Sequence, residues 1–203
     1  MDTKQLPTKN NLMKIKSSIK QSKEGHLLLE QKRMILSREL EKYKDDEKKM
    51  KEHGKELLDE AYHYLKMANV EIGIDDMIDI SDGIKLDNSL DIKYKTIMGV
   101  EIPSIVPDES ETTINYGLYN TTSSVDMAIL KFTEVKKYIL ELAQLENIIF
   151  RLEKDIEKVQ RRSNALKEII IPKDEQLAKN IQDILDENEK EEFIRLKKLK
   201  GKR

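Results

Sequence analysis

Apolar residues recur every three or four positions along the second half of the chain, from Val125 to Pro172. Ser163 is the one polar position in this apolar seam, and Lys, Glu and Arg border it. Such spacing predicts one long helix with a narrow apolar face. Two steps of three fall together at Ile139–Leu142–Leu145, which predicts a local change of register. A face this narrow cannot bury itself, so the pattern also predicts a partner helix.

The first part of the chain has the same spacing, from Leu12 to Ala68. Two helices with matched periods and a connector predict an antiparallel hairpin. The expected fold class is therefore mainly α, a long antiparallel two-helix coiled coil with a small middle head that contains a short β-hairpin. The predicted seam comprises Leu12, Ile15, Ile19, Leu29, Leu36, Leu40, Leu57, Ile139, Leu142, Leu145, Ile149, Leu152, Ile156, Val159, Leu166 and Ile170.

Polar residues interrupt the first seam at two levels, one made of Ser22, His26 and Arg33 and the other of Glu47 and Gly54. If Ala68 lies opposite Val125, the first level faces the region of Ser163 and the second faces residues 139–146. Pro172 lacks an N–H and crowds the preceding turn, so the second helix is expected to bend or restart there. We therefore predict two weakened levels along an otherwise apolar seam.

The segment between the helices differs in composition, because glycines and prolines replace the Lys–Glu pairs. We divide the chain into an N-terminal helix (1–70), a head (71–122) and a C-terminal helix with a basic tip (123–203). LDIKYKT, Leu90–Thr96, alternates apolar and polar residues as a strand does, and VEI before Pro103 is a candidate second strand.

Acidic residues cluster at the start of the head, from Asp75 to Gly83. If Gly83 is aligned with the glycine of a calcium-binding loop, Ile78 and Ile80 fall where oxygen ligands are required, so the match fails. The segment is instead expected to be an acidic loop that is either solvated or faces a partner.

Composition favours long solvated helices over a thick core, because 38% of the 203 residues are hydrophobic and 37% are charged. The net charge of −2 gives no overall field for nucleic acid or an anionic membrane. No apolar stretch approaches the roughly 20 residues of a membrane-spanning helix. With no cysteine, a cytoplasmic location is expected.

The residues that could carry chemistry do not form a catalytic or metal-binding pattern. His26, His53 and His63 lack the spacing of metal ligands, and no glycine-rich phosphate loop or nucleophile elbow is present. The basic tail lacks the interleaved aromatics of a nucleic-acid reader. We therefore predict no catalysis by this chain, no cofactor, no metal and no nucleic acid partner.

Five separated stretches resemble the D subunit of the V/A-type rotary ATPases. They are Pro7–Leu36, IMGVEIP (Ile97–Pro103), YGLYNTTSSVDMAI (Tyr116–Ile129), RRSNALKEIIIP (Arg161–Pro172) and Leu185–Lys200. The resemblance covers both helices and the head in the same order. It implies a non-catalytic central-stalk protein that couples ATP hydrolysis or synthesis to ion translocation, at the cytoplasmic side and peripheral to the membrane.

The resemblance also implies partners. The ends of the chain would enter the hexamer of catalytic and regulatory subunits, the F subunit would bind the side of the shaft, and a funnel-shaped protein would link it to the membrane ring, with no direct membrane insertion. The candidate contact residues are Glu47, Gly54, Arg161, Arg162, Arg195, Lys197 and Lys198. Two other classes fit the helical pattern alone, a prefoldin-like chaperone subunit and a generic coiled-coil tether.

Overall fold

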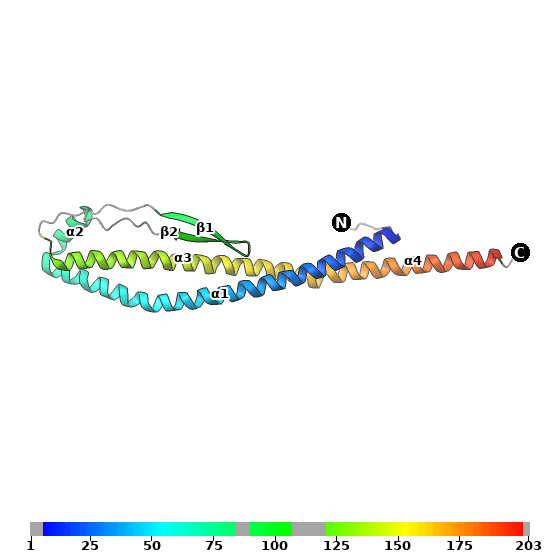
Figure 1. Ribbon diagram of the computed structural model, residues 1–203, viewed down its shortest axis with the longest axis horizontal. Helices are drawn as coiled ribbons and strands as arrows, with labels where there is room; N and C mark the ends of the chain where they lie inside the picture. The colour runs from blue at the N-terminus through cyan, green and yellow to red at the C-terminus, as the bar shows by residue number, and fades with distance from the viewer. Residues whose placement is uncertain (1–5, 84–89, 107–120, 201–203) are drawn as a thin grey trace. The chain divides into compact units, whose positions relative to one another are not determined.

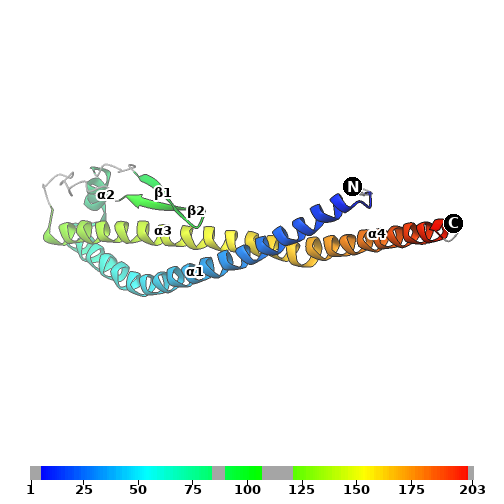
Figure 2. The ribbon, with the colours of Figure 1, turned by 45° about the vertical axis from the view of Figure 1, so that its right-hand side comes forward.

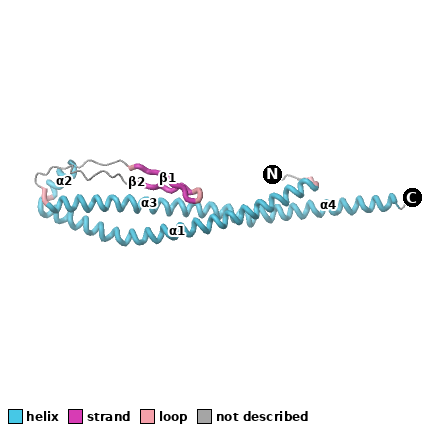
Figure 3. The backbone as a smooth tube through the Cα atoms, viewed as in Figure 1, coloured by secondary structure: helices cyan, strands magenta, loops and turns pink. Residues whose placement is uncertain are grey.

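A computed structural model describes residues 6–83, 90–106 and 121–200 (Figure 1). In chain order the elements are α1 (Lys9–Ile72), α2 (Ile74–Gly83), β1 (Asp91–Ile97), β2 (Val100–Val106), α3 (Ser123–Ala165), a π-helical segment η1 (Leu166–Ile170) and α4 (Ile171–Lys200). Figure 3 shows that helix dominates and that the strands form one small hairpin. The predicted fold class is confirmed.

The chain divides into two compact units, which we describe separately: a terminal unit (1–35 with 156–203) and a middle unit (36–155). In the terminal unit the start of α1 packs antiparallel to α4. Lys9 pairs with Glu189 at 2.7 Å, and Lys23 pairs with Glu175 at 2.7 Å. The apolar core between the two helices contains Leu12, Ile15, Ala178 and Ile181, with Ile19, Leu177 and Leu185 packed against it.

In the middle unit the rest of α1 packs antiparallel to α3. Lys44 pairs with Glu153 at 2.7 Å, and further along Ser124 Oγ donates to Glu71 Oε1 at 2.9 Å. Ala68 and Val125, which the sequence analysis places opposite each other, are both buried at this end. The buried residues of this helix pair include Leu36, Ala61, Ala68, Val125, Ala128, Val135, Ile148, Ile149 and Leu152.

The two predicted strands form an antiparallel hairpin within the middle unit. Ile97 pairs with Val100, and the register continues to Asp91 opposite Val106. The connecting residues Met98 and Gly99 have φ angles of 50° and 82°, as both central residues of a type I′ turn do. Figures 1 and 2 both show the hairpin alongside α3.

The acidic start of the head is helical, so the prediction of an acidic loop from Asp75 to Gly83 is wrong. These residues lie in α2, whose Met77 and Ile80 are half-buried while the aspartates are exposed. The apolar residues three positions apart lie on one helical face, which the acidic composition concealed. The rest of the predicted head, residues 84–89 and 107–120, lies outside the described residues.

Among the described helices none has an apolar run long enough to cross a bilayer.

Candidate functional site

The helix seam is the most extensive candidate site, because the predicted residues line it in both units. Six of them are buried: Leu12, Ile15, Leu36, Ile149, Leu152 and Val159. Eight are half-buried: Ile19, Leu29, Leu40, Leu57, Leu142, Leu145, Ile156 and Leu166. The remaining two, Ile139 and Ile170, are 50% and 40% exposed and lie outside the seam. Both exceptions have a specific physical cause.

Tyr138 takes the place that the sequence analysis assigned to Ile139. The Tyr138 hydroxyl donates to the carbonyl oxygen of Met50 at 2.9 Å, and the ring covers the Cα of Gly54. The seam on α3 therefore has two consecutive spacings of three residues, one before and one after Val135. From Tyr138 onward, spacings of four and three residues alternate through Leu142 to Leu152. The change of register exists, but it lies earlier on α3 than predicted. The expected step of four residues after Val135 leads to Ile139, so the spacing rule alone misses Tyr138.

The π-helical segment η1 explains the exposure of Ile170. In η1 the N–H of Ile171 bonds to the carbonyl oxygen of Leu166, five residues earlier, so one extra residue is accommodated in the turn. The buried face consequently passes from Leu166 to Ile171, which is 9% exposed, and not to Ile170. Pro172 follows directly and has no N–H for the carbonyl four residues back. The restart predicted at Pro172 thus takes the form of a π-bulge.

The polar level predicted around Ser22, His26 and Arg33 contains a hydrogen-bonded cluster in the terminal unit. Ser163 is fully buried, and its hydroxyl donates to Glu30 Oε1 at 2.6 Å. His26 Nδ1 lies 2.8 Å from the hydroxyl oxygen of Ser163. Because the serine hydrogen is used by the carboxylate, His26 must donate and therefore carries a hydrogen on Nδ1.

Glu30 joins this cluster to Arg33, whose Nε and Nη2 both donate to Glu30 Oε2, at 3.1 and 3.0 Å. The hydrogen bond from Ser163, followed by those from Arg33, lowers the pKa of Glu30 below its ordinary value. The cluster therefore holds an ionised carboxylate against the buried hydroxyl. Sequence reasoning identified Ser163, His26 and Arg33 but missed Glu30, which lies one helical turn from His26 and was not in the seam count.

The second polar level, at Glu47 and Gly54, lies in the middle unit. Lys51 bridges the helices, at 2.7 Å from Glu47 and 3.0 Å from Glu146. These two carboxylates, Glu47 first, raise the pKa of Lys51. Gly54 is buried under the ring of Tyr138, so it presents no side chain to a partner and is withdrawn as a contact residue. Glu47 is half-buried beside exposed residues and stays a candidate.

Comparison with known proteins identifies the relatives of this chain. Residues 11–201 match the model of a family described as the D subunit of ATP synthase. The chain is 37% identical to the D subunit of the V-type ATP synthase of Thermotoga neapolitana, over 97% of both chains. It is 39% identical to the D subunit of the A-type ATP synthase of Pyrococcus horikoshii, over 96% of this chain and 92% of the relative.

The chain belongs to the ATP synthase D-subunit family. The remaining contact candidates of this family member are basic residues on exposed helix surfaces of the terminal unit. Arg161 pairs with Glu157 and Arg195 with Glu191, both one turn along the same helix. Arg162, Lys197 and Lys198 are exposed. The tip also exposes apolar side chains, with Phe193 at 68% and Leu196 at 66%.

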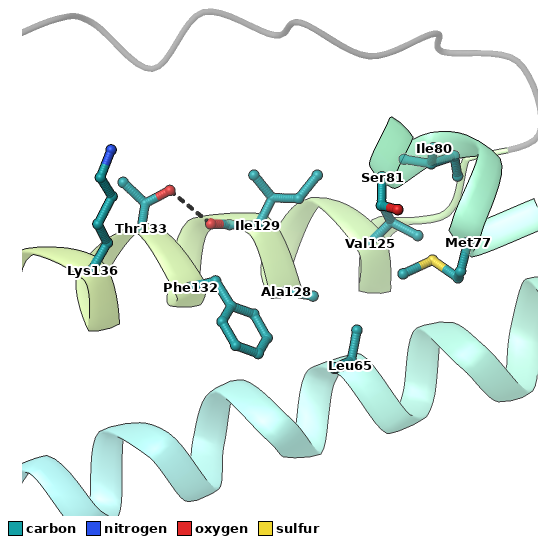
Figure 4. Close-up of a pocket in the computed structure, with 10 residues that line it drawn as sticks. All are labelled: Leu65, Met77, Ile80, Ser81, Val125, Ala128, Ile129, Phe132, Thr133 and Lys136. Carbon is teal, nitrogen blue, oxygen red and sulfur yellow. Dashed lines mark hydrogen bonds between the residues drawn. The ribbon is translucent and has the colours of Figure 1, made fainter. Parts of the chain in front are cut away.

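Sequence reasoning did not anticipate an apolar pocket in the middle unit of this family member (Figure 4). Its volume is about 320 Å³, and its lining includes Leu65 of α1, Met77 of α2 and Phe132 of α3. The hydroxyl of Thr133 donates to the carbonyl oxygen of Ile129 at 2.8 Å, so this hydrogen bond is formed within α3 itself.

In the described parts of the chain no group of His, Asp or Glu side chains could hold a metal ion.

Proposed function

We propose that this chain is the non-catalytic central shaft of a V/A-type rotary ATPase. In this proposal the shaft turns inside the hexamer of catalytic and regulatory subunits and couples ATP hydrolysis or synthesis to ion movement through the membrane ring. It would act at the cytoplasmic side, peripheral to the membrane. The observation that carries the proposal is antiparallel helix pairing in both units of a chain that belongs to the ATP synthase D-subunit family.

A shaft transmits torque by contact, so its function depends on long helices and an asymmetric surface more than on catalytic residues. Helices α1 and α3 supply 64 and 43 residues of helix. In the terminal unit α4 extends past the start of α1, since Lys9 pairs with Glu189 and residues 186–200 are exposed (Figure 1). One exposed helix end presents different surfaces to the surrounding subunits as the shaft turns. Alternative packings of this kind can couple a rotor position to a catalytic state.

The deciding experiment is co-purification of the tagged chain with its complex. We expect one copy for each catalytic hexamer, together with the other rotary ATPase subunits. Recovery with prefoldin chains or unrelated scaffold proteins would overturn the rotor role and support the chaperone or tether class.

The exposed tip of α4 is proposed to lie inside the catalytic hexamer. Deletion of Phe193–Arg203 should impair assembly or coupling while helicity, measured by circular dichroism, falls only by the residues removed. The matched variant replaces Phe193 and Leu196 by Ser at full length, which keeps the helix and removes the apolar contacts. Wild-type coupling in both variants would exclude an engaged tip.

The F subunit is proposed to bind the side of the shaft at the level of Glu47. Lys48 of α1 and Glu141 of α3 are exposed near this level, so their charges can be reversed without disturbing the seam. Lys48→Glu with Glu141→Lys should release the F subunit from a purified pair. Lys14→Glu with Lys179→Glu, exposed in the terminal unit, is the control. Equal co-elution of the F subunit with both variants would remove this docking level.

A further inference from the structure

The hairpin contacts α3 through the outer edge of β2. Pro103 pairs with Tyr94 and has no N–H, so this pair is not joined by ladder hydrogen bonds. By alternation, the backbone groups of Glu101 and Ile105 also point away from β1. Both are satisfied by α3: Arg151 Nη1 donates to the carbonyl oxygen of Glu101 at 3.0 Å, and the N–H of Ile105 donates to Gln144 Oε1 at 2.7 Å.

Within the described residues, β1 pairs with β2 alone, so its outer edge has no partner strand there. Ile92, Tyr94 and Thr96 stand opposite Ile105, Pro103 and Glu101, so their N–H and C=O groups point outward. Every β1 residue before Ile97 is exposed, including Ile92 at 51% and Tyr94 at 60%. Among the described residues, no hydrogen bond reaches these three backbone positions from outside the hairpin. Sheet edges of this kind are templates for another strand.

Side chains make this edge selective. Lys93 and Lys95 pair with Ser104 and Ile102, so both lysines lie on the face opposite Ile92 and Tyr94. Both are exposed, and neither forms an ion pair within the described chain. Edge lysines disfavour pairing with a neutral or basic strand, because docking would remove water from their charged ammonium groups without providing a counter-charge. A strand that brings carboxylates to the same face avoids this penalty and gains cross-strand ion pairs.

We propose that the outer edge of β1 is a docking site for an extended segment of a partner protein in which carboxylates alternate with apolar residues. The segment adds a third strand through the backbone of Ile92, Tyr94 and Thr96, a mode of recognition known as β-augmentation. Its carboxylates meet Lys93 and Lys95, and its apolar side chains cover Ile92 and Tyr94. The proposal goes beyond the rotor role and does not depend on it.

The probe is a short labelled peptide in which glutamate alternates with valine, titrated into the full chain and followed by fluorescence anisotropy. A peptide in which lysine replaces glutamate is the charge control. We expect saturable binding of the glutamate peptide only, and slowed hydrogen exchange at the amides of Ile92, Tyr94 and Thr96. Absent or equal binding of the two peptides would overturn the proposal, as would concentration-dependent pairing of two copies through β1.

Thr96→Pro removes one outward donor without touching the ladder, because Lys95 and Ile97 carry the neighbouring ladder bonds. Thr96→Val is the matched control, since it keeps the N–H. Losing one hydrogen bond should weaken the peptide about fivefold to tenfold in the proline variant alone. Protection of the Lys95 amide verifies that the hairpin persists. Lys93→Glu with Lys95→Glu should reverse the preference to the lysine peptide; unchanged preference would contradict the assigned chemistry.

Discussion

The ring of Tyr138 occupies the space that a side chain at position 54 would need. A Cβ built on Gly54 would lie 2.0 Å from the Tyr138 hydroxyl oxygen and 2.1 Å from Cζ. The same hydroxyl donates to the carbonyl oxygen of Met50 on α1. A glycine in the middle of a helix, normally unfavourable by about 1 kcal/mol relative to alanine, is thus matched to an aromatic residue on the facing helix.

We predict that Gly54→Ala destabilises the middle unit despite the better helix propensity of alanine. The added methyl must displace Tyr138, which costs about 1–3 kcal/mol for overpacking and lost hydrogen bonding. Urea unfolding followed by circular dichroism measures the change. In the Tyr138→Ala background the same substitution should instead be neutral or stabilising. Equal effects in the two backgrounds would show that these residues are not coupled.

The seam in the middle unit predicts a contrast between two isoleucines on α3. Ile149 is 8% exposed, whereas Ile139 is 50% exposed. Ile149→Ala should lower the free energy of unfolding by about 2–5 kcal/mol because it leaves a cavity. Ile139→Ala should cost less than about 0.5 kcal/mol, as surface substitutions usually do. A similar loss of unfolding free energy in both variants would show that Ile139 is part of the seam after all.

Apolar periodicity is sufficient to predict the long helices, because each buries one face and its side chains repeat at a fixed angle. It did not predict α2, whose acidic residues concealed the apolar face. It cannot place residues whose position depends on a hydrogen bond. Tyr138 lies in the seam because its hydroxyl donates a hydrogen bond to the Met50 carbonyl oxygen. Ile171 is buried in place of Ile170 because the π-helical turn contains one extra residue. The strand before Pro103 was predicted, but only the register and the bond from Ile105 to Gln144 show that its outer edge faces α3.

Ser163 is predicted to stabilise the terminal unit through its bond to Glu30. Ser163→Ala leaves Glu30 and His26 without their shared partner, and we expect a loss of about 1 kcal/mol because both can still reach water. Ser163→Val should recover part of the loss through apolar burial. Chemical denaturation of the full chain provides both values. A more stable Ser163→Ala variant would show that the buried hydroxyl is a net cost.

The lowered pKa of Glu30 makes part of this stability dependent on pH. As the pH falls, Glu30 of the unfolded chain is protonated near its ordinary pKa of 4.5, at a higher pH than Glu30 of the folded chain. The stabilisation by the ionised carboxylate is therefore complete above that pH. It is lost as the pH falls through the lower pKa of the folded state. Glu30→Gln should therefore be less stable than wild type at neutral pH, with a difference that shrinks in acid. A difference that stays the same at every pH would show that the Glu30 carboxylate is not the stabilising group.

The π-bulge predicts an asymmetric tolerance to deletion. Removing Ile169, which is 64% exposed within η1, would turn the five-residue step from Leu166 to Ile171 into an ordinary α-helical step of four. The seam on α4 would then keep its register, so the variant should stay within about 1 kcal/mol of wild type.

Deleting the exposed Lys179 is the matched control, because it lies between Ala178 and Ile181 in regular helix and rotates every later residue by about 100°. That rotation moves Ile181 off the face that packs against Leu12 and Ile15. We expect a much larger loss of stability than from the Ile169 deletion, measured by thermal unfolding of the full chain. If the two deletions cost the same, η1 does not set the register of α4.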